Sequence, residues 1–245
     1  MSAVGAHEPI PLCGAKWAAK SEAYAALISE HISPTTVWLD AGCGSRLLEE
    51  DLDPLEDWLA GQAQTLIGVD PRATSHRNIR VLVQGSLDHL PFPSNCLDLV
   101  TCRMVVEHLD NPMAAFSEIH RCLRPSGAVV IITPSLHNYG VFGNALAAKL
   151  LKEEWRVRLL QFFAPRSKGN IFPVHYRANT MPRLRRLLQQ SGLHIHKQVA
   201  LRQHLPHWKK TAKLELLFMK LTPISALMVC AHKNPRNTVQ RACSP

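Results

Sequence analysis

The 245-residue sequence has no apolar run long enough to cross a membrane as a helix. Its longest apolar stretch near the end, residues 221–231, is interrupted by Thr222 and Pro223, whereas a spanning helix needs about 20 apolar residues. Residues 1–20 lack the apolar core of a secretion signal and include Glu8. We therefore expect a cytoplasmic protein without a transmembrane span, at most peripheral to a membrane.

Paired cysteines are also missing, because the seven cysteines are scattered and form no C-x-x-C pair. This pattern argues against a disulfide scaffold and a cysteine-based zinc module. His194 and His196 share one face of a predicted strand, but two histidines without a third ligand do not make a zinc site. We therefore expect no metal. The absence of G-x-S-x-G and G-K-[ST] strings also excludes nucleophile-elbow hydrolases and P-loop enzymes.

Acidic residues are scarce in the second part of the chain. Residues 146–245 hold 19 Lys and Arg against 3 Asp and Glu, a balance of +16, whereas residues 1–145 hold 9 against 16, a balance of −7. Such a basic region favours an anionic partner. Three partners fit: a phosphate-bearing or lipid-like small molecule, an anionic membrane surface, or RNA, the last being disfavoured because no RNA-binding module is recognisable.

Short apolar runs alternate with amphipathic stretches, which predicts an α/β fold with parallel strands covered on both faces. The predicted strands are residues 36–40, 65–70, 79–84, 97–102, 128–133, 193–199 and 226–231. The predicted helices are residues 53–61, 112–123, 144–163, 182–190 and 213–221. For the first of these helices, Asp53 is the predicted N-cap and Glu56 the capping-box acid.

The most informative motif is V-W-L-D-A-G-C-G-S, in which a strand ends at Asp40 and Gly42 and Gly44 open a turn. Glycines are needed where the backbone turns tightly and approaches a ligand. An acid at this position would repel a pyrophosphate but could face an ammonium or sulfonium group. The next strand, L-I-G-V-D, ends at Asp70, where a carboxylate can accept both hydroxyls of a ribose.

The order of these motifs resembles the class I S-adenosylmethionine-dependent methyltransferases. The resemblance covers residues 35–135 and adds L-P-F at 90–92, L-D-L-V at 97–100, V-E-H-L at 106–109 and L-R-P-S-G at 123–127. It implies a Rossmann-like, doubly wound, seven-stranded sheet whose last strand is antiparallel. Residues 1–34 would then be an N-terminal helical segment, residues 35–135 the donor-binding core, and residues 136–245 a basic region with a helical lid that completes the sheet.

The resemblance also implies where S-adenosylmethionine binds. Asp40, Gly42, Cys43 and Gly44 would border its methionine part, and Asp70 its ribose. Ser86 and Leu87 would border the adenine, and the backbone near Arg103 the amino-acid end.

Two residues depart from the family pattern. Arg46 stands where the family often has another glycine, so either the loop is shaped differently or Arg46 meets the donor's carboxylate. Ser86 replaces the family's usual acid, but its hydroxyl can accept from the adenine amino group, and Asp88 is close by.

Two histidines are candidate general bases, because the imidazole pKa lies near neutral pH. His108 follows the fourth predicted strand, and His137 follows the fifth. His175, Tyr176 and Arg177 are candidate substrate contacts in the segment P-V-H-Y-R-A-N-T. For all of these, the alternative is a structural role in packing a turn or capping a helix.

The sequence therefore predicts an enzyme that transfers a methyl group to a small-molecule, lipid-like or glycan-like acceptor. Two alternatives stay open at this point: an RNA methyltransferase that holds its substrate with the basic half, and a non-catalytic binding protein that keeps the fold.

Overall fold

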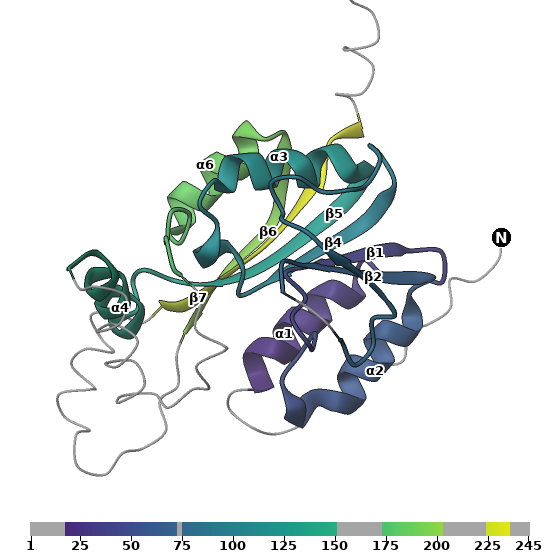
Figure 1. The fold of residues 1–245 in the computed structure, drawn as a ribbon, viewed down its shortest axis with the longest axis horizontal. Helices are drawn as coiled ribbons and strands as arrows, with labels where there is room; N and C mark the ends of the chain where they lie inside the picture. Colours follow the sequence, from purple (N-terminus) through teal and green to yellow (C-terminus); the bar gives the residue numbers. More distant parts are fainter. Residues whose placement is uncertain (1–17, 73–74, 151–172, 203–223, 236–245) are drawn as a thin grey trace, which may run out of the picture.

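The computed structural model describes residues 18–72, 75–150, 173–202 and 224–235 (Figure 1). Its centre is one seven-stranded sheet with the order β3-β2-β1-β4-β5-β7-β6. The strands are β1 (Val37–Ala41), β2 (Thr65–Asp70), β3 (Val81–Gln84), β4 (Leu97–Arg103), β5 (Leu123–Pro134), β6 (Leu193–Arg202) and β7 (Ile224–Lys233). All seven predicted strands are confirmed, although β5, β6 and β7 are longer and β3 is shorter than the sequence indicated.

The sheet is doubly wound, as predicted. From β1 the chain builds outward to β2 and β3, and then returns to place β4 on the other side of β1. This reversal puts a switch point at the carboxyl ends of β1 and β4, where such sheets bind ligands. β7 is antiparallel to both of its neighbours, β5 and β6, and the other strand pairs are parallel, so the prediction of an antiparallel last strand is confirmed.

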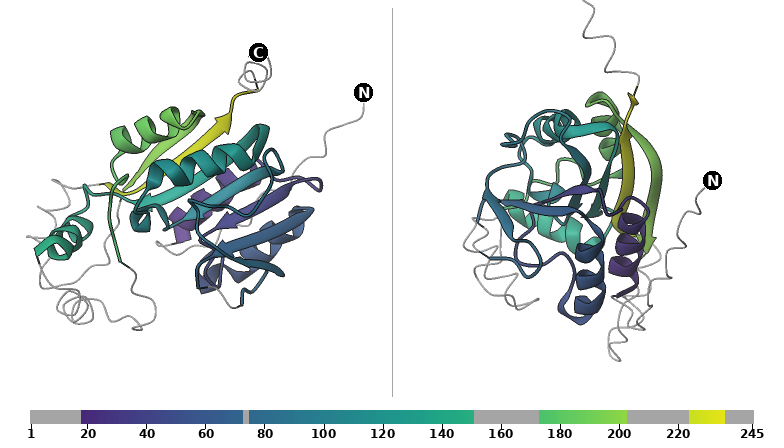
Figure 2. Two further views of the ribbon diagram at one scale, coloured as in Figure 1. Left: turned by 45° about the horizontal axis from the view of Figure 1, so that its top comes forward. Right: turned by 90° about the vertical axis from the view of Figure 1, so that its right-hand side faces the viewer.

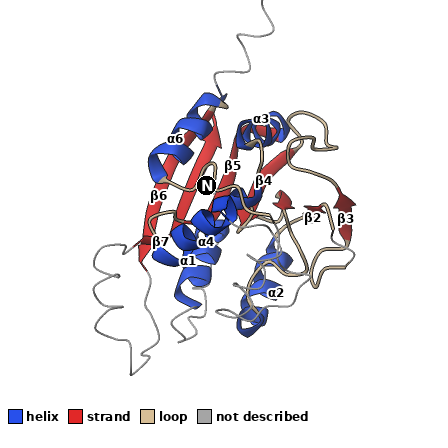
Figure 3. Ribbon diagram, turned by 60° about the vertical axis from the view of Figure 1, so that its left-hand side comes forward, coloured by secondary structure: helices blue, strands red, loops and turns tan. Residues whose placement is uncertain are grey.

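Helices cover both faces of the sheet (Figure 2). The helical segments are α1 (Ala18–Ser29), η1 (Glu50–Leu52), α2 (Asp53–Gln62), η2 (Val106–His108), α3 (Pro112–Cys122), α4 (Tyr139–Leu150) and α6 (Met181–Gln190). α1 and α2 lie on one face, and α3 and α6 on the other (Figure 1). α6 packs against α3 and β6, beside the outer part of the sheet (Figure 3).

Each face has its own apolar core. Phe116 and Ile119 of α3 pack with Leu184 of α6 on one side, and Tyr24 of α1 packs with Trp38 of β1 on the other. All five side chains are almost fully buried. Because burying one large apolar side chain contributes roughly 1.5–3 kcal/mol, these two layers hold the helices against the strands and fix the strand ends.

Local signals explain where several helices begin and end. α3 starts at Pro112, and the Asn111 side chain caps it by accepting from the Ala114 N–H at 3.1 Å. α6 is followed by Gly192, whose φ of +89° favours glycine. For α2 the predicted cap is wrong: Asp53 is already helical, and no side chain caps this helix. Asp53 instead pairs with Arg46 and Arg77.

The predicted helix at residues 144–163 starts earlier, as α4, and its part beyond Leu150 lies outside the described residues. The predicted helix at residues 213–221 lies outside them entirely, so the helical lid stays a prediction. Among the helices of the described ranges, none combines the length and the apolarity that crossing a bilayer requires.

Candidate donor-binding and active site

The turn after β1 is folded tightly against the end of β2. The backbone N–H groups of Gly42 and Cys43 both donate to the Val69 carbonyl, at 2.6 and 3.2 Å. Gly42 has a φ of +75°, and a Cβ atom there would lie 2.3 Å from the Val105 side chain. Position 42 therefore requires glycine for both its conformation and its space.

Gly44 and Asp70 meet at the carboxyl edge of the sheet. The Gly44 N–H donates to Asp70 Oδ2 at 3.1 Å, and the Arg72 N–H donates to Asp70 Oδ1 at 2.7 Å. Gly44 has a φ of +53°, and there is open space where its Cβ atom would be. The structure thus brings together the glycine turn and the strand-end acid that the sequence singled out 26 residues apart.

Asp40 lies at the carboxyl edge of β1, but its side chain is buried. Its Oδ1 accepts from the Thr101 hydroxyl at 2.6 Å, and that hydroxyl accepts from the Trp38 indole N–H at 2.7 Å. Burial raises the pKa of the Asp40 carboxyl to about 7, although the hydrogen bond from Thr101 and the charge of Arg103 oppose this shift. A nearby cationic ligand would favour the ionised form.

The loop after β3 reaches the same edge. The Gly85 N–H contacts the Asp70 carbonyl at 3.4 Å, Ser86 is exposed, and Leu87 is buried. The Ser86 hydroxyl donates to Asp88, and this hydrogen bond lowers the pKa of the Asp88 carboxyl. The polar group after β3 is therefore the hydrogen-bonded pair of Ser86 and Asp88. Ser86 is the residue that was predicted to border the adenine, and Asp88 adds a carboxylate beside it.

Two arginines shape the loop after the glycine turn. At the end of β4, Arg103 donates through Nε to the Leu47 carbonyl at 2.8 Å and through Nη1 to Glu49 at 3.2 Å. Arg46 pairs with Asp53 at the start of α2. The guanidinium of Arg46 is therefore held by a carboxylate of the protein itself.

His108 lies in η2, directly after β4, and is half-buried. Its Nδ1 is 2.6 Å from the Pro173 carbonyl oxygen, which means that the neutral imidazole carries its proton on Nδ1. The N–H groups of His175 and Tyr176 donate to the Glu107 carbonyl, at 2.8 and 3.1 Å. The segment that begins at Pro173 thus lies along η2.

The other predicted site residues lie near this edge. Arg177 pairs with Asp110 at 2.6 Å, and His175 lies 3.8 Å from the same carboxylate. Tyr176 has a φ of +50°. His137 is exposed after β5, and its N–H donates to the Ser135 hydroxyl at 3.1 Å. Their contacts with a substrate stay a prediction.

The sequence interpretation missed a buried polar cluster of Glu107, Thr133 and Asn179. The Thr133 hydroxyl donates to Glu107 at 3.0 Å and accepts from the Asn179 amide at 2.7 Å, and all three side chains are buried. Burial raises the pKa of the Glu107 carboxyl to about 7. The motif V-E-H-L contains Glu107, but nothing in the sequence indicates that Thr133 and Asn179 would contact it.

A doubly wound sheet with a glycine turn and a strand-end carboxylate at its switch point defines a Rossmann-like nucleoside-binding domain. Comparison with known proteins shows what this domain is similar to. Residues 39–131 match the family model described as "Methyltransferase domain". This part of the chain is therefore similar to a methyltransferase domain, of the class whose methyl donor is S-adenosylmethionine.

Individual methyltransferases match part of the chain. The chain is 30% identical over 80 residues to a demethylmenaquinone methyltransferase of Staphylococcus haemolyticus, which covers 33% of this chain and 34% of that protein. This chain spans about a third or less of the length of the curated relatives that it matches.

Solved structures share the fold over most of the chain. The YcgJ protein of Bacillus subtilis has a TM-score of 0.55 at 16% identity, covering 87% of this chain and 99% of that one. Geranyl diphosphate C-methyltransferase of Streptomyces coelicolor has a TM-score of 0.54 at 15% identity, covering 87% and 79%.

Proposed function

We propose that the protein transfers a methyl group from S-adenosylmethionine to a small-molecule acceptor with an apolar portion. The observation that carries this proposal is the pairing of the Gly44 N–H with the Asp70 carboxylate at the switch point of the sheet. Asp70 uses two acceptor positions for the N–H groups of Gly44 and Arg72. A carboxylate has about four such positions, so two remain for a ribose diol.

The residues around this pair fit the rest of the donor. The open space at Gly44 allows a ligand to lie against the backbone. The Asp40 carboxylate would face the cationic amino-acid end, and the Ser86–Asp88 pair would accept from the adenine amino group. When bound, S-adenosylmethionine supplies an electrophilic methyl group, and the chain's task is to hold an acceptor atom in line with it.

His108 is the residue that we assign to proton removal. Its Nδ1–H is directed to the Pro173 carbonyl, so Nε2, which lies 4.0 Å from Glu107 Oε1, is the ring nitrogen that would take a proton from the acceptor. The segment that holds His108 also carries His175, Tyr176 and Arg177, which we propose as acceptor contacts. His137 is the second candidate base, because it follows β5 at the same edge of the sheet.

An apolar acceptor is supported by the side chains near this edge. Met104, which follows β4, is 46% exposed. Phe142, Leu146 and Leu150 recur every four residues on α4 and are also exposed; this helix lies past the carboxyl end of β5 (Figure 1). The names of the Staphylococcus relative and the Streptomyces neighbour, an enzyme of demethylmenaquinone and one of geranyl diphosphate, point to the same class of acceptor.

Titration calorimetry with S-adenosylhomocysteine tests donor binding. Asp70→Asn removes the charge but keeps the shape of the carboxyl group, and we expect its dissociation constant to rise about 10- to 100-fold, the worth of hydrogen bonds to a charged group. Asp51→Asn, on exposed η1, is the matched control and should bind like the wild type. The absence of binding by wild-type protein at millimolar ligand would refute the proposal and favour a non-catalytic protein.

Transfer of a labelled methyl group to a total lipid extract, compared with total RNA, then tests the acceptor. We expect label in the lipid extract, and His108→Ala should lower turnover about 100-fold or more while leaving the dissociation constant of S-adenosylhomocysteine unchanged. Label in the RNA alone would overturn the acceptor class, and unchanged turnover would remove His108 as the base.

A further inference from the structure

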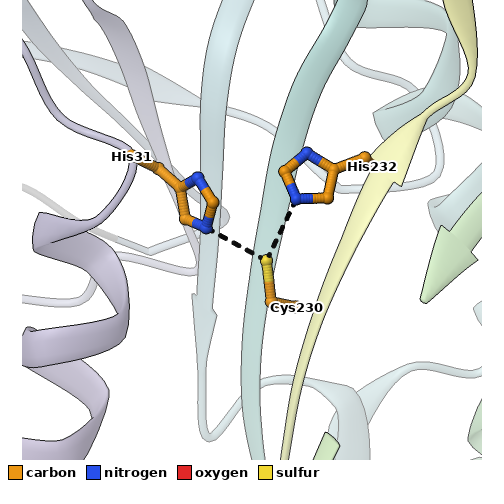
Figure 4. A group of neighbouring side chains, drawn as sticks. All are labelled: His31, Cys230 and His232. Atoms are coloured by element: carbon orange, nitrogen blue, oxygen red, sulfur yellow. Dashed lines mark hydrogen bonds between the residues drawn. The ribbon is translucent and has the colours of Figure 1, made fainter. Parts of the chain in front are cut away.

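Three metal-binding side chains meet on the α1 face of the sheet, outside the site described above. His31 lies in the turn after α1, and Cys230 and His232 lie on β7. Figure 4 shows their ring nitrogens and sulfur pointing toward a common centre. Cys230 Sγ is 3.2 Å from His31 Nε2 and 3.7 Å from His232 Nε2, and the three atoms all lie within 4.8 Å of one another.

These distances match a tetrahedral site. Zinc lies about 2.3 Å from a cysteine sulfur and about 2.0–2.1 Å from a histidine nitrogen. At a tetrahedral angle, the sulfur and each nitrogen would then be ~3.5 Å apart. The two observed distances bracket this value. We propose that His31, Cys230 and His232 bind a divalent transition-metal ion, with Zn²⁺ as the expected occupant.

The protonation states suit this assignment for the two histidines. His232 Nδ1 lies 3.4 Å from the Ser126 carbonyl, which favours a proton on Nδ1 and leaves Nε2, the atom that faces Cys230, as the ligand atom. Burial lowers the pKa of both His31 and His232, and a neighbouring histidine lowers each further.

The thiol needs the metal to ionise. Burial raises the pKa of Cys230 to about 12, but a coordinating metal ion displaces the thiol proton. Binding therefore releases this proton to solvent. The charged groups that face the cluster, Glu30 of the turn after α1 and Lys197 of β6, pair with each other at 3.0 Å and so leave the cluster without a net charge of its own.

The strand next to the cluster has an irregularity that brings a further imidazole close. His194 pairs with His232, Ile195 with Ala231, and Lys197 with Cys230, so His196 is an extra residue in a β-bulge. Bulges redirect side chains, and the His196 ring contacts the His232 ring edge-on, with centroids 5.4 Å apart. A fourth ligand, from His196 or from water, would complete the tetrahedron.

The proposed ion would join parts of the chain that are 199 residues apart, His31 and Cys230. It would bridge the turn after α1 and the strand β7. His232 pairs with Ala128, whereas the carboxyl end of β5 at Pro134 pairs with Ala226 at the other end of the ladder. This site is thus separate from the carboxyl edge, and the inference does not depend on methyl transfer.

Titration of the reduced, chelator-treated full chain with Co²⁺ tests the site, because a cobalt–thiolate bond gives a charge-transfer band in the near ultraviolet. We expect one equivalent to bind with this band, and Zn²⁺ to displace it. Loss of a residue that only hydrogen-bonds to a metal ligand typically weakens metal binding roughly 10- to 100-fold. His31→Asn removes a ligand itself, so it should raise the dissociation constant for Co²⁺ by more than that. Cys230→Ser should abolish the band.

Matched controls separate this site from the other cysteines and histidines. Cys96→Ser and His194→Ala, which leave the three ligands in place, should bind Co²⁺ like the wild type. A wild-type chain without the thiolate band, or a band that persists in Cys230→Ser, would overturn the proposal. If Cys230→Ser does not fold, His31→Asn in the turn after α1 decides, since wild-type affinity in this variant would equally overturn it.

Discussion

At the scale of single residues, two buried carboxyl groups lie where the molecule is expected to bind its ligands. Asp40 is hydrogen-bonded to Thr101 in the sheet, and Glu107 is hydrogen-bonded to Thr133 below η2. Burial raises the pKa of each to about 7. Each carboxyl group therefore changes its charge near neutral pH. Because its pKa is raised on folding, each lowers the free energy of unfolding as pH rises, whereas an acid in a surface ion pair has the opposite effect.

The pH dependence of stability reports on Glu107. Its folded pKa is raised above 4.5, so from about pH 4.5 to 7 the folded protein keeps a proton that the unfolded chain has lost. The unfolding free energy must therefore fall as pH rises through this window. Glu107→Gln, whose amide oxygen still accepts from Thr133, should remove roughly 2–3 kcal/mol of this fall.

Urea unfolding at pH 5 and pH 8 measures this difference. We expect Glu107→Gln to be more stable than the wild type at pH 8 and the two to converge toward pH 5. Glu50→Gln, on exposed η1, is the control. Parallel pH dependences for the wild type and Glu107→Gln would show that Glu107 is not the group responsible.

At the scale of elements, the turn between β1 and η1 depends on backbone conformations that only glycine adopts easily. Gly42 is the more demanding position, because a side chain there would also overlap Val105. Gly44 has a positive φ but open space around it. The two glycines therefore differ in what a methyl group would cost.

Gly42→Ala should lower the unfolding free energy by about 2–4 kcal/mol, the sum of left-handed strain and overpacking, and should weaken binding of S-adenosylhomocysteine. Gly44→Ala should cost about 1–2 kcal/mol, from strain alone. Gly61→Ala, inside α2 with open space around it, should be neutral or stabilising by about 0.5–1 kcal/mol. Thermal unfolding of the three variants ranks them, and equal costs at positions 42 and 61 would contradict this account.

The same elements show what the sequence could and could not predict. Apolar runs that end in Asp40 and Asp70, and glycines that follow one of them, are local patterns, so the strands and the acids at their ends were predictable. The partners of Arg46 and Glu107 were not, because Asp53, Thr133 and Asn179 are brought to them by helix placement and sheet order. Asp53 was predicted to cap α2 because it precedes Pro54 and Glu56. Its ion pairs with Arg46 and Arg77 depend on how the chain folds, so the sequence pattern does not show them.

At the scale of the whole molecule, β7 holds the sheet together by lying between β5 and β6. It ends at Lys233, a buried lysine whose ammonium donates to Asn95 Oδ1 at 2.7 Å, to the His120 carbonyl at 2.9 Å and to the Leu123 carbonyl at 2.8 Å. This side chain ties the last strand to the junction between α3 and β5.

Lys233→Met should lower the unfolding free energy by about 2–4 kcal/mol, because it leaves buried acceptors without a donor. Lys197→Met, on the neighbouring strand β6, breaks an exposed ion pair with Glu30 of the turn after α1 and should cost less than about 1 kcal/mol. Chemical denaturation of both variants in the presence of a chelator gives the comparison, and a cost at position 233 no larger than at position 197 would contradict the anchoring role.

The central position of β7 has a consequence for biosynthesis. Residues 224–233 leave the ribosome after every other strand of the sheet has been made, yet they fill the gap between two of those strands. Until then β5 keeps an open, apolar edge and β6 has nothing to pair with, which is the kind of surface that associates with other nascent chains. During translation, the risk of aggregation at this edge therefore lasts until residues 224–233 have been made and have joined the sheet.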